Sequence, residues 1–166
     1  ECLNETTKLL DTVLESVRSF SFELAPISLY EIGLAQSLNR LCEDKSRLLG
    51  VQGEFEYEGE DESIPEQLVL VLFRSASELL NNLAKHAKCM AFGMKLTQDE
   101  VFVTLTVWDN GVGFPTGFGE ASHGLFTGKA MGLAMVTNRI ELLGGQIVFP
   151  KLDSPGARVE IRVPML

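Results

Sequence analysis

The sequence predicts a two-layer α/β sandwich, in which helices with one apolar stripe cover a sheet with one apolar face. Long segments carry apolar residues at helical spacing, and short segments alternate apolar and polar residues as strands do. Of the 166 residues, 45% are hydrophobic, which is enough for a sizeable core. The order of the segments (helix, strand, helix, strand hairpin, helix, strand pair) departs from the strict βαβ alternation of a doubly wound sheet.

The first predicted element is an amphipathic helix over residues 3–24. Its apolar residues repeat every seven positions from Leu3 to Leu24, a spacing that fits a seam between two helices, for example in a dimer. Packing of this helix on its own domain is the alternative, because three heptads are barely enough for such a seam. The pair Ala25-Pro26 ends the helix.

A second helix is predicted from about Glu31 to Leu49, with Gly50 as its C-cap. Residues 51–57 alternate and predict a strand. The run Ser63-Ile-Pro-Glu66 has the form of a capping box with a proline in the first turn, so it predicts the start of a long central helix. We expect this helix to end near Lys88.

The second half of the chain contains four predicted strands and one helix. Residues 115–130 are rich in glycine and follow no period; an aperiodic stretch of this length in a compact domain is usually functional or mobile. A turn at 97–100 makes the first two strands a hairpin, and Gly144-Gly145 closes the helix. The predicted segments are strands at 90–96 and 101–108, a helix at 131–143, and strands at 146–149 and 157–163.

Composition and charge exclude several classes of function. The net charge of −9 argues against binding of a nucleic-acid backbone. The longest apolar run, residues 68–73, is too short to span a membrane, no signal peptide is visible, and we expect this chain to make no membrane contact. The three cysteines follow no pattern and predict reduced thiols in a cytoplasmic protein. Two distant histidines do not predict a zinc site.

The central helix combines a buried stripe with an unusual polar row. Glu78, Asn82 and Lys85 recur at i, i+4 and i+7 and therefore share one face, with Asn81 and His86 beside them. An amide oxygen from Asn82, phosphate oxygens and water would satisfy Mg²⁺, and Glu78 could order a water or accept a proton. A solvated polar face is the alternative interpretation. The predicted buried stripe consists of Leu72, Ala76, Leu79, Leu80, Leu83 and Ala87.

The run from Asp109 to Gly113, Asp-Asn-Gly-Val-Gly, follows an apolar strand. A carboxylate buried there is costly without a partner, and the exocyclic amine of adenine would supply one, whereas guanine would present a second acceptor. Gly111 and Gly113 carry no side chain, so a flat ligand could lie against bare backbone. An ordinary strand-to-loop turn is the alternative.

Glycines also lead directly into the last helix, at Gly128 and Gly132. Free N–H groups and the helix dipole favour phosphate at such a position. The run is neither a P-loop nor a dinucleotide fingerprint. Together the three motifs would supply the metal, base and phosphate contacts of one nucleotide.

Residues 51–166 resemble the ATP-binding catalytic domain of sensor histidine kinases, in the wider group that includes DNA gyrase, the Hsp90 chaperones and MutL. The central helix resembles the N box of that family, residues 109–113 its G1 box, and residues 128–132 its G2 box. The run Glu-Leu-Leu-Asn-Asn-Leu-Ala-Lys-His-Ala, residues 78–87, is similar to the form in NarL/DesK-like kinases. Residues 17–34 resemble the end of their second dimerisation helix and its linker.

The resemblance implies a Bergerat fold and a three-part organisation. Residues 1–26 would be the C-terminal part of a dimerisation helix, residues 27–50 a linker helix packed on or belonging to the ATPase domain, and residues 51–166 the ATP-binding catalytic domain. The implied cofactors are ATP and Mg²⁺. The implied partners are a response regulator and, through the N-terminal helix of the parent protein, a second copy of the chain; nucleic acid is not among them.

The resemblance also implies a role for each motif residue. Glu78 would be the general base or would position water, Asn82 would bind Mg²⁺, and residues 115–130 would form a lid over ATP. Asp109 would hold adenine, with Gly111 and Gly113 beneath it. The residues implied to contact the nucleotide are Asn82, Lys85, His86, Asp109, Gly111, Gly113, Gly128, Gly132 and Leu133.

Two departures from the family pattern are visible. Ala130 stands where the family has the middle glycine of the G2 box, and His123-Gly124-Leu125 is a rival alignment for that box. Neither His86 nor His123 lies where the family places its phosphoacceptor histidine. The chain also begins at Glu1, within a helical pattern. We therefore expect a fragment that transfers phosphate to a histidine outside it and is inactive in autophosphorylation alone, and membrane anchoring of the parent stays open.

Two alternative functions remain. An anti-sigma-factor serine kinase has the same fold, but its sequence would start at the ATP domain, so the helix over residues 3–24 argues against it. A module that binds nucleotide or pairs helices without turnover is the second alternative, and the presence of Glu78 argues against that one.

Overall fold

A computed structural model describes residues 27–59, 64–115 and 131–165 of the chain. The predicted helix over residues 3–24, Ser63 and the glycine-rich residues 116–130 lie outside these ranges. The described elements are α2 (Ile27–Ile32), α3 (Leu34–Leu49), β1 (Gln52–Glu58), α4 (Glu66–His86), β2 (Ala91–Gln98), β3 (Phe102–Asp109), α5 (Met131–Leu142), β4 (Gln146–Val148) and β5 (Ala157–Pro164).

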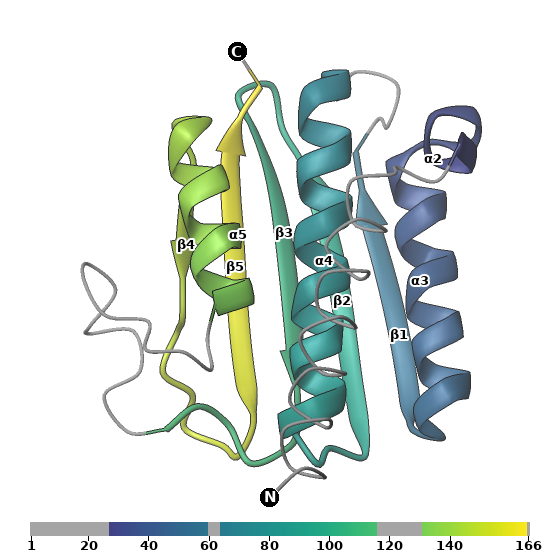
Figure 1. Cartoon of the computed structure of the whole chain (residues 1–166), viewed down its shortest axis with the longest axis vertical. Coiled ribbons are helices and arrows are strands. Elements are labelled where there is room, and N and C mark those ends of the chain that lie inside the picture. Colours follow the sequence, from purple (N-terminus) through teal and green to yellow (C-terminus); the bar gives the residue numbers. More distant parts are fainter. Residues whose placement is uncertain (1–26, 60–63, 116–130, 166) are drawn as a thin grey trace, which may run out of the picture.

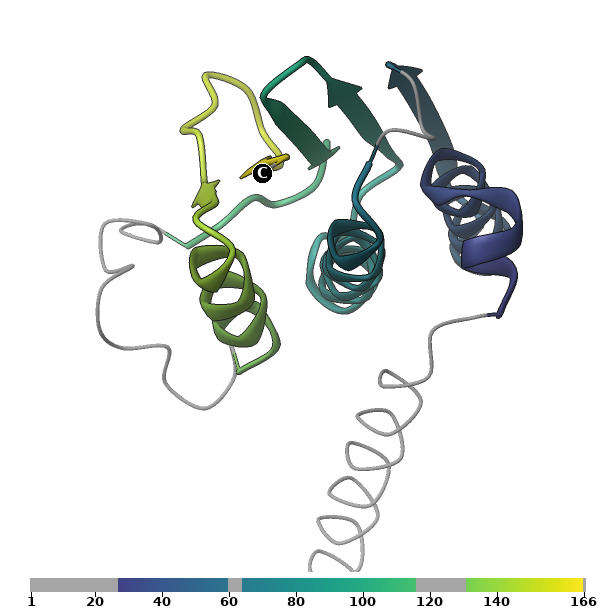
Figure 2. The same cartoon turned by 90° about the horizontal axis from the view of Figure 1, so that it is seen from above.

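The strands form one five-stranded sheet in the order β1-β2-β3-β5-β4. β1 and β2 are parallel and α4 connects them, whereas the other neighbouring strands are antiparallel. Seen from above, α3, α4 and α5 lie on one side of the sheet (Figure 2). The predicted two-layer α/β sandwich is therefore confirmed.

The core lies between α4 and the sheet, with α3 and α5 on either side of α4 (Figure 1). All six residues of the predicted apolar stripe of α4 are buried. They belong to one cluster with inward-facing strand residues such as Met94, Leu105 and Ile161. Because burial of each large apolar side chain contributes about 1.5–3 kcal/mol, this stripe fixes α4 against the sheet.

The helix α3 belongs to the same core. Leu34, Leu38 and Cys42 are almost completely buried, and α3 contacts both β1 and α4. The Cys42 thiol donates to the Glu54 carbonyl oxygen at 3.3 Å. Burial, aided by Glu43 and Glu54, raises the pKa of Cys42 to about 11. The thiol bond thus adds a polar contact with β1 to the apolar packing of α3.

Three predicted boundaries are wrong. The second helix does not run unbroken from Glu31, because Gly33 has a φ of 81° and separates α2 from α3. The proline does not lie in the first turn of α4, since the helix begins only after Pro65, whose ψ of 136° is extended; the capping box itself involves Ser63, which lies outside the described residues. Met90 and Val101 lie outside the strands and are exposed.

The predicted C-cap of the second helix and the predicted strand hairpin are confirmed. Gly50 ends α3 in the left-handed conformation, with a φ of 66°, and its N–H donates to the Ser46 carbonyl at 2.9 Å. β2 and β3 form the predicted hairpin. Its turn is set by Asp99, whose Oδ1 accepts the N–H groups of Val101 and Phe102, both at 2.8 Å.

Candidate functional site

The polar row of α4 lies on the side of the helix away from its buried stripe. Glu78 and Asn82 are partly buried, while Lys85 and His86 are exposed near the C-terminal end of the helix. Asn81 faces α3 instead, where Lys45 Nζ donates to Asn81 Oδ1 at 2.6 Å. The row therefore changes from a sheltered acid at one end to exposed cationic and imidazole groups at the other.

Glu78 is placed to handle a proton. Burial raises the pKa of its carboxyl above the ordinary value, while the nearby charge of Lys85 and a hydrogen bond from the Asn82 amide act in the opposite direction. A carboxyl whose pKa moves upward toward neutrality is a better general base than a fully solvated one. The local environment of Glu78 thus suits the role implied by the resemblance.

Asn82 links this acid to a possible metal position. Its amide nitrogen donates to Glu78, and an amide also carries an oxygen that serves as a hard ligand for Mg²⁺. One side chain can therefore hold the carboxylate and ligate a cation at the same time. Phosphate oxygens and water would complete the coordination.

Asp109 is the last residue of β3 and only 9% exposed. Its Oδ1 accepts the Gly111 N–H at 2.8 Å, and none of the ion pairs within the described ranges involves it. A carboxylate offers about four acceptor positions. Asp109 therefore keeps acceptor capacity for a donor from outside the chain, as predicted for the adenine amine.

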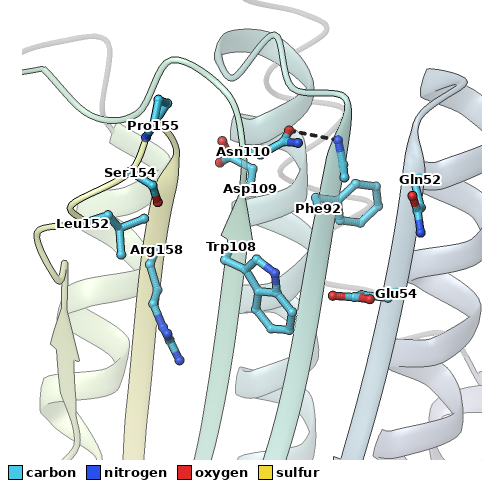
Figure 3. A pocket seen from close by; sticks show the side chains of 11 residues that line it. Gln52, Glu54, Phe92, Trp108, Asp109, Asn110, Leu152, Ser154, Pro155 and Arg158 are labelled. Atoms are coloured by element: carbon cyan, nitrogen blue, oxygen red, sulfur yellow. Dashed lines mark hydrogen bonds between the residues drawn. The ribbon is translucent and has the colours of Figure 1, made fainter.

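The loop after Asp109 is joined to the C-terminal end of α4. The Val112 N–H donates to the Ala87 carbonyl at 2.8 Å. Asn110 Oδ1 accepts the N–H groups of Met90 and Ala91 at 2.9 and 3.0 Å, and one of these bonds is drawn in Figure 3. The two elements that carry Asp109 and Asn82 are thus held together by backbone contacts. Sequence reasoning missed the role of Asn110, because the run from Asp109 to Gly113 was interpreted through its aspartate and glycines, as a base site or as an ordinary turn.

The two glycines of this loop are required by packing within the chain. A Cβ on Gly111 would overlap the Ala87 carbonyl oxygen. Gly113 has a φ of 74°, and a Cβ there would lie 2.7 Å from the Gly156 carbonyl oxygen. Any side chain at either position would push the loop away from its neighbours. Contact of these glycines with a base stays a prediction.

The third motif is described only in part. Gly128 lies outside the described residues. Gly132 is in the first turn of α5, and a Cβ there would overlap the Glu78 carboxylate, which places the third motif next to the first. The Leu133 side chain is buried in the core, with 5% exposure, so its backbone is the part left to contact a nucleotide.

A separate hollow of about 310 Å³ lies on the face of the sheet that no described helix covers. Figure 3 looks onto this face, with Trp108 and Arg158 on neighbouring strands and Glu54 across from them. Trp108 pairs with Gly93 on β2, and its ring occupies the space that a side chain there would fill. Of the predicted site residues that the structure describes, only Asp109 lines this hollow.

No described helix combines the length and apolar character needed to cross a membrane.

Comparison with known families gives a match over more than half of the chain. Residues 68–166 match the family of histidine kinase-, DNA gyrase B-, and HSP90-like ATPases. The DegS histidine-protein kinase/phosphatase of Brevibacillus brevis is 28% identical over 163 residues, which are 98% of this chain and 40% of DegS. The nitrate/nitrite sensor protein NarX of Escherichia coli is 27% identical over 135 residues, which are 81% of this chain and 21% of NarX. The chain thus spans less than half the length of these relatives.

Solved structures share the fold at lower identity. The catalytic domain of histidine kinase ThkA superposes with a TM-score of 0.63 at 20% identity, covering 80% of this chain and 91% of that domain. The blue-light activated histidine kinase of Erythrobacter litoralis gives the same TM-score and identity, covering 80% of this chain and 45% of that protein.

Proposed function

Because the chain belongs to the histidine kinase-, DNA gyrase B-, and HSP90-like ATPase family, as its three motifs predicted, we propose that it is the ATP-binding catalytic domain of a two-component sensor histidine kinase. One observation supports this most directly. The loop that carries the buried Asp109 is hydrogen-bonded to the end of the helix that carries Glu78 and Asn82. The Asp109 carboxylate, suited to a purine, and the Asn82 amide, suited to a metal, are therefore held at a fixed spacing.

In this proposal ATP lies along α4, with its base at Asp109 and its phosphates toward Asn82. Asp109 accepts a hydrogen bond from the adenine amine, and the exposed Lys85 and His86 donate to phosphate oxygens. Mg²⁺ bound at the Asn82 oxygen would neutralise phosphate charge, an effect that dominates phosphoryl transfer. The remaining nucleotide contacts come from Gly111, Gly113, Gly128, Gly132 and Leu133.

Glu78 acts as the general base or positions a water in the transfer of the γ-phosphoryl group. Two features of Glu78 support this role. Its partial burial raises the pKa of its carboxyl. The Asn82 amide, one helical turn along the same face, donates a hydrogen bond that holds the carboxylate near the proposed metal. The phosphoryl group would pass to a ring nitrogen of a histidine outside this chain, as its bond to the β-phosphate breaks and ADP leaves.

The wider setting of the domain is also part of the proposal. The helix over residues 1–26 would pair with that of a second copy, residues 27–50 would link it to the domain, and residues 51–166 would form the domain itself. A response regulator would accept the phosphoryl group downstream, as expected of proteins related to DegS and NarX, which are named histidine kinase and sensor protein. The three cysteines without a pattern favour the cytoplasm for this chain.

The test is phosphorylation from radiolabelled ATP in the full-length protein that contains this chain. Glu78→Gln should bind ATP as wild type does but should be phosphorylated about 100-fold more slowly, the scale of a lost general base. Glu43→Gln is the matched control, because Glu43 is an exposed acid on α3. Equal rates for Glu78→Gln and wild type would remove Glu78 from the mechanism. Absence of ATP binding at millimolar concentration would end the proposal itself.

A further inference from the structure

Gly132 is the second residue of α5, and it lies directly against Glu78 of α4. A Cβ added to Gly132 would overlap Glu78 Oε1 and would lie 2.5 Å from its Cδ and 3.3 Å from its Cγ. The carboxylate of Glu78 therefore occupies the volume that any side chain at position 132 would need.

The backbone of Gly132 does not itself require glycine. Its φ lies outside the positive range that disfavours other residues, unlike that of Gly113 or Gly144. Within a helix glycine is less favourable than alanine, because it loses more backbone freedom on folding. Local structure thus favours alanine at this position. What favours glycine is the space that it leaves for the Glu78 carboxylate.

A methyl group at position 132 would displace that carboxylate with little effect on the fold. The atoms that it would meet are the end of a flexible side chain, with no backbone among the nearest three. Glu78 could rotate out toward solvent, away from the Asn82 amide that donates to it. The expected damage therefore falls on the position of one functional group.

We propose that Gly132 is a positioning residue, whose bare Cα forms the surface that holds the Glu78 carboxylate beside Asn82. This inference rests on the proposed function of Glu78. It goes beyond the nucleotide contact expected for Gly132, since it gives the residue a role even without ATP.

The first test measures the placement of Glu78 without any activity assay. The chain is labelled with ¹³C at glutamate Cδ, and the Glu78 signal is assigned by its loss in Glu78→Gln. At neutral pH the wild-type Glu78 signal should stand apart from those of exposed glutamates, because its carboxylate accepts the Asn82 amide hydrogen bond, and in Gly132→Ala it should move toward them. Asn138→Ala is the control, because it also improves helix propensity on α5 but at an exposed position. An unchanged Glu78 signal in Gly132→Ala would overturn the proposal.

The second test is a double-mutant cycle on the phosphorylation rate of the full-length protein. Gly132→Ala should slow phosphorylation about tenfold or more. The ATP affinity should stay within about twofold of wild type, because the nucleotide contact proposed for Gly132 uses its backbone, which alanine retains. In the Glu78→Gln background the same substitution should cause no further loss, since the two residues act as one unit. An equal loss in both backgrounds, or a fall in ATP affinity that accounts for the slower rate, would overturn the proposal in favour of a direct nucleotide or lid role.

The two tests separate this inference from the proposed function. If Glu78→Gln alone leaves the rate unchanged, Glu78 has no role in transfer, and the positioning role of Gly132 fails with it even when the Glu78 signal moves in Gly132→Ala. If Gly132→Ala lowers the thermal unfolding midpoint, the shorter acid in Gly132→Ala/Glu78→Asp should restore it. Failure of that pair to recover would show that the methyl group disturbs something other than Glu78.

Discussion

Replacement of Asp109 separates two contributions of its carboxylate. Oδ1 accepts the buried Gly111 N–H at 2.8 Å, and the proposed adenine contact uses the remaining acceptor capacity. Asp109→Asn keeps an oxygen for Gly111 but loses the charge and turns a donor toward adenine, whereas Asp109→Ala removes both interactions. The two variants should therefore lose ATP affinity alike but differ in stability.

The expected magnitudes follow from these contacts. A charge-assisted hydrogen bond contributes about 1.5–3 kcal/mol, so either variant should weaken ATP binding by about 10- to 150-fold. Asp109→Ala also leaves the Gly111 N–H without its acceptor, which should lower its free energy of unfolding by about 1–3 kcal/mol relative to Asp109→Asn.

A titration with a fluorescent adenine nucleotide in the presence of Mg²⁺ measures the affinity, and urea unfolding measures the stability. Asp44→Asn is the control, because it neutralises an exposed aspartate on α3. Unchanged affinity in both Asp109 variants would refute the adenine contact. Equal stability of the two variants would refute the importance of the Gly111 bond.

Two further predictions concern other groups. Asn110→Ala should lower the free energy of unfolding by about 0.5–1.5 kcal/mol, because the Met90 and Ala91 N–H groups exchange their Asn110 acceptor for water at this exposed position. It should also weaken ATP binding. Asn39→Ala, whose amide reaches the exposed Glu43, should do neither in the same assays, and equal behaviour of the two variants would contradict the role given to Asn110. Because the pKa of Cys42 is raised from 9.0 to about 11 in the folded chain, the stability that the neutral thiol confers is complete below pH 9 and lost as the pH rises through 11. Between pH 9 and 11, urea unfolding should show the free energy of unfolding of wild type falling by about 2–3 kcal/mol relative to that of Cys42→Ala. The same pH dependence of stability in both proteins would count against burial of the thiol.

Periodicity predicted most of the fold because it reports which side of an element is buried. The apolar stripe of α4 was predicted residue by residue, and the strands were predicted as strands. Periodicity does not report where an element ends, since the last residues pack less than the middle ones. Three of the wrong predictions concern such ends: the helix break at Gly33, the late start of α4 after Pro65 and the exposed Met90.

The site was predictable where the signal is local. The alternation of β3 places Asp109 at the end of a buried strand, and helical spacing places Glu78 and Asn82 on one face. The link from Asn110 to the start of β2 and the contact between Gly132 and Glu78 join segments 19 or more residues apart. No spacing rule carries such information, because it depends on how separate elements pack.

The packing of α3 has a mechanical consequence. Its buried Leu34 and Leu38 make residues 34–49 part of the same cooperative unit as the sheet. A twist or pull applied to the chain before Ile27 would therefore act on the outermost strand, β1, through the two helices α2 and α3, which are joined by a single bend at Gly33. A force from the preceding residues would reach the sheet directly, whereas a flexible linker at this position would absorb it.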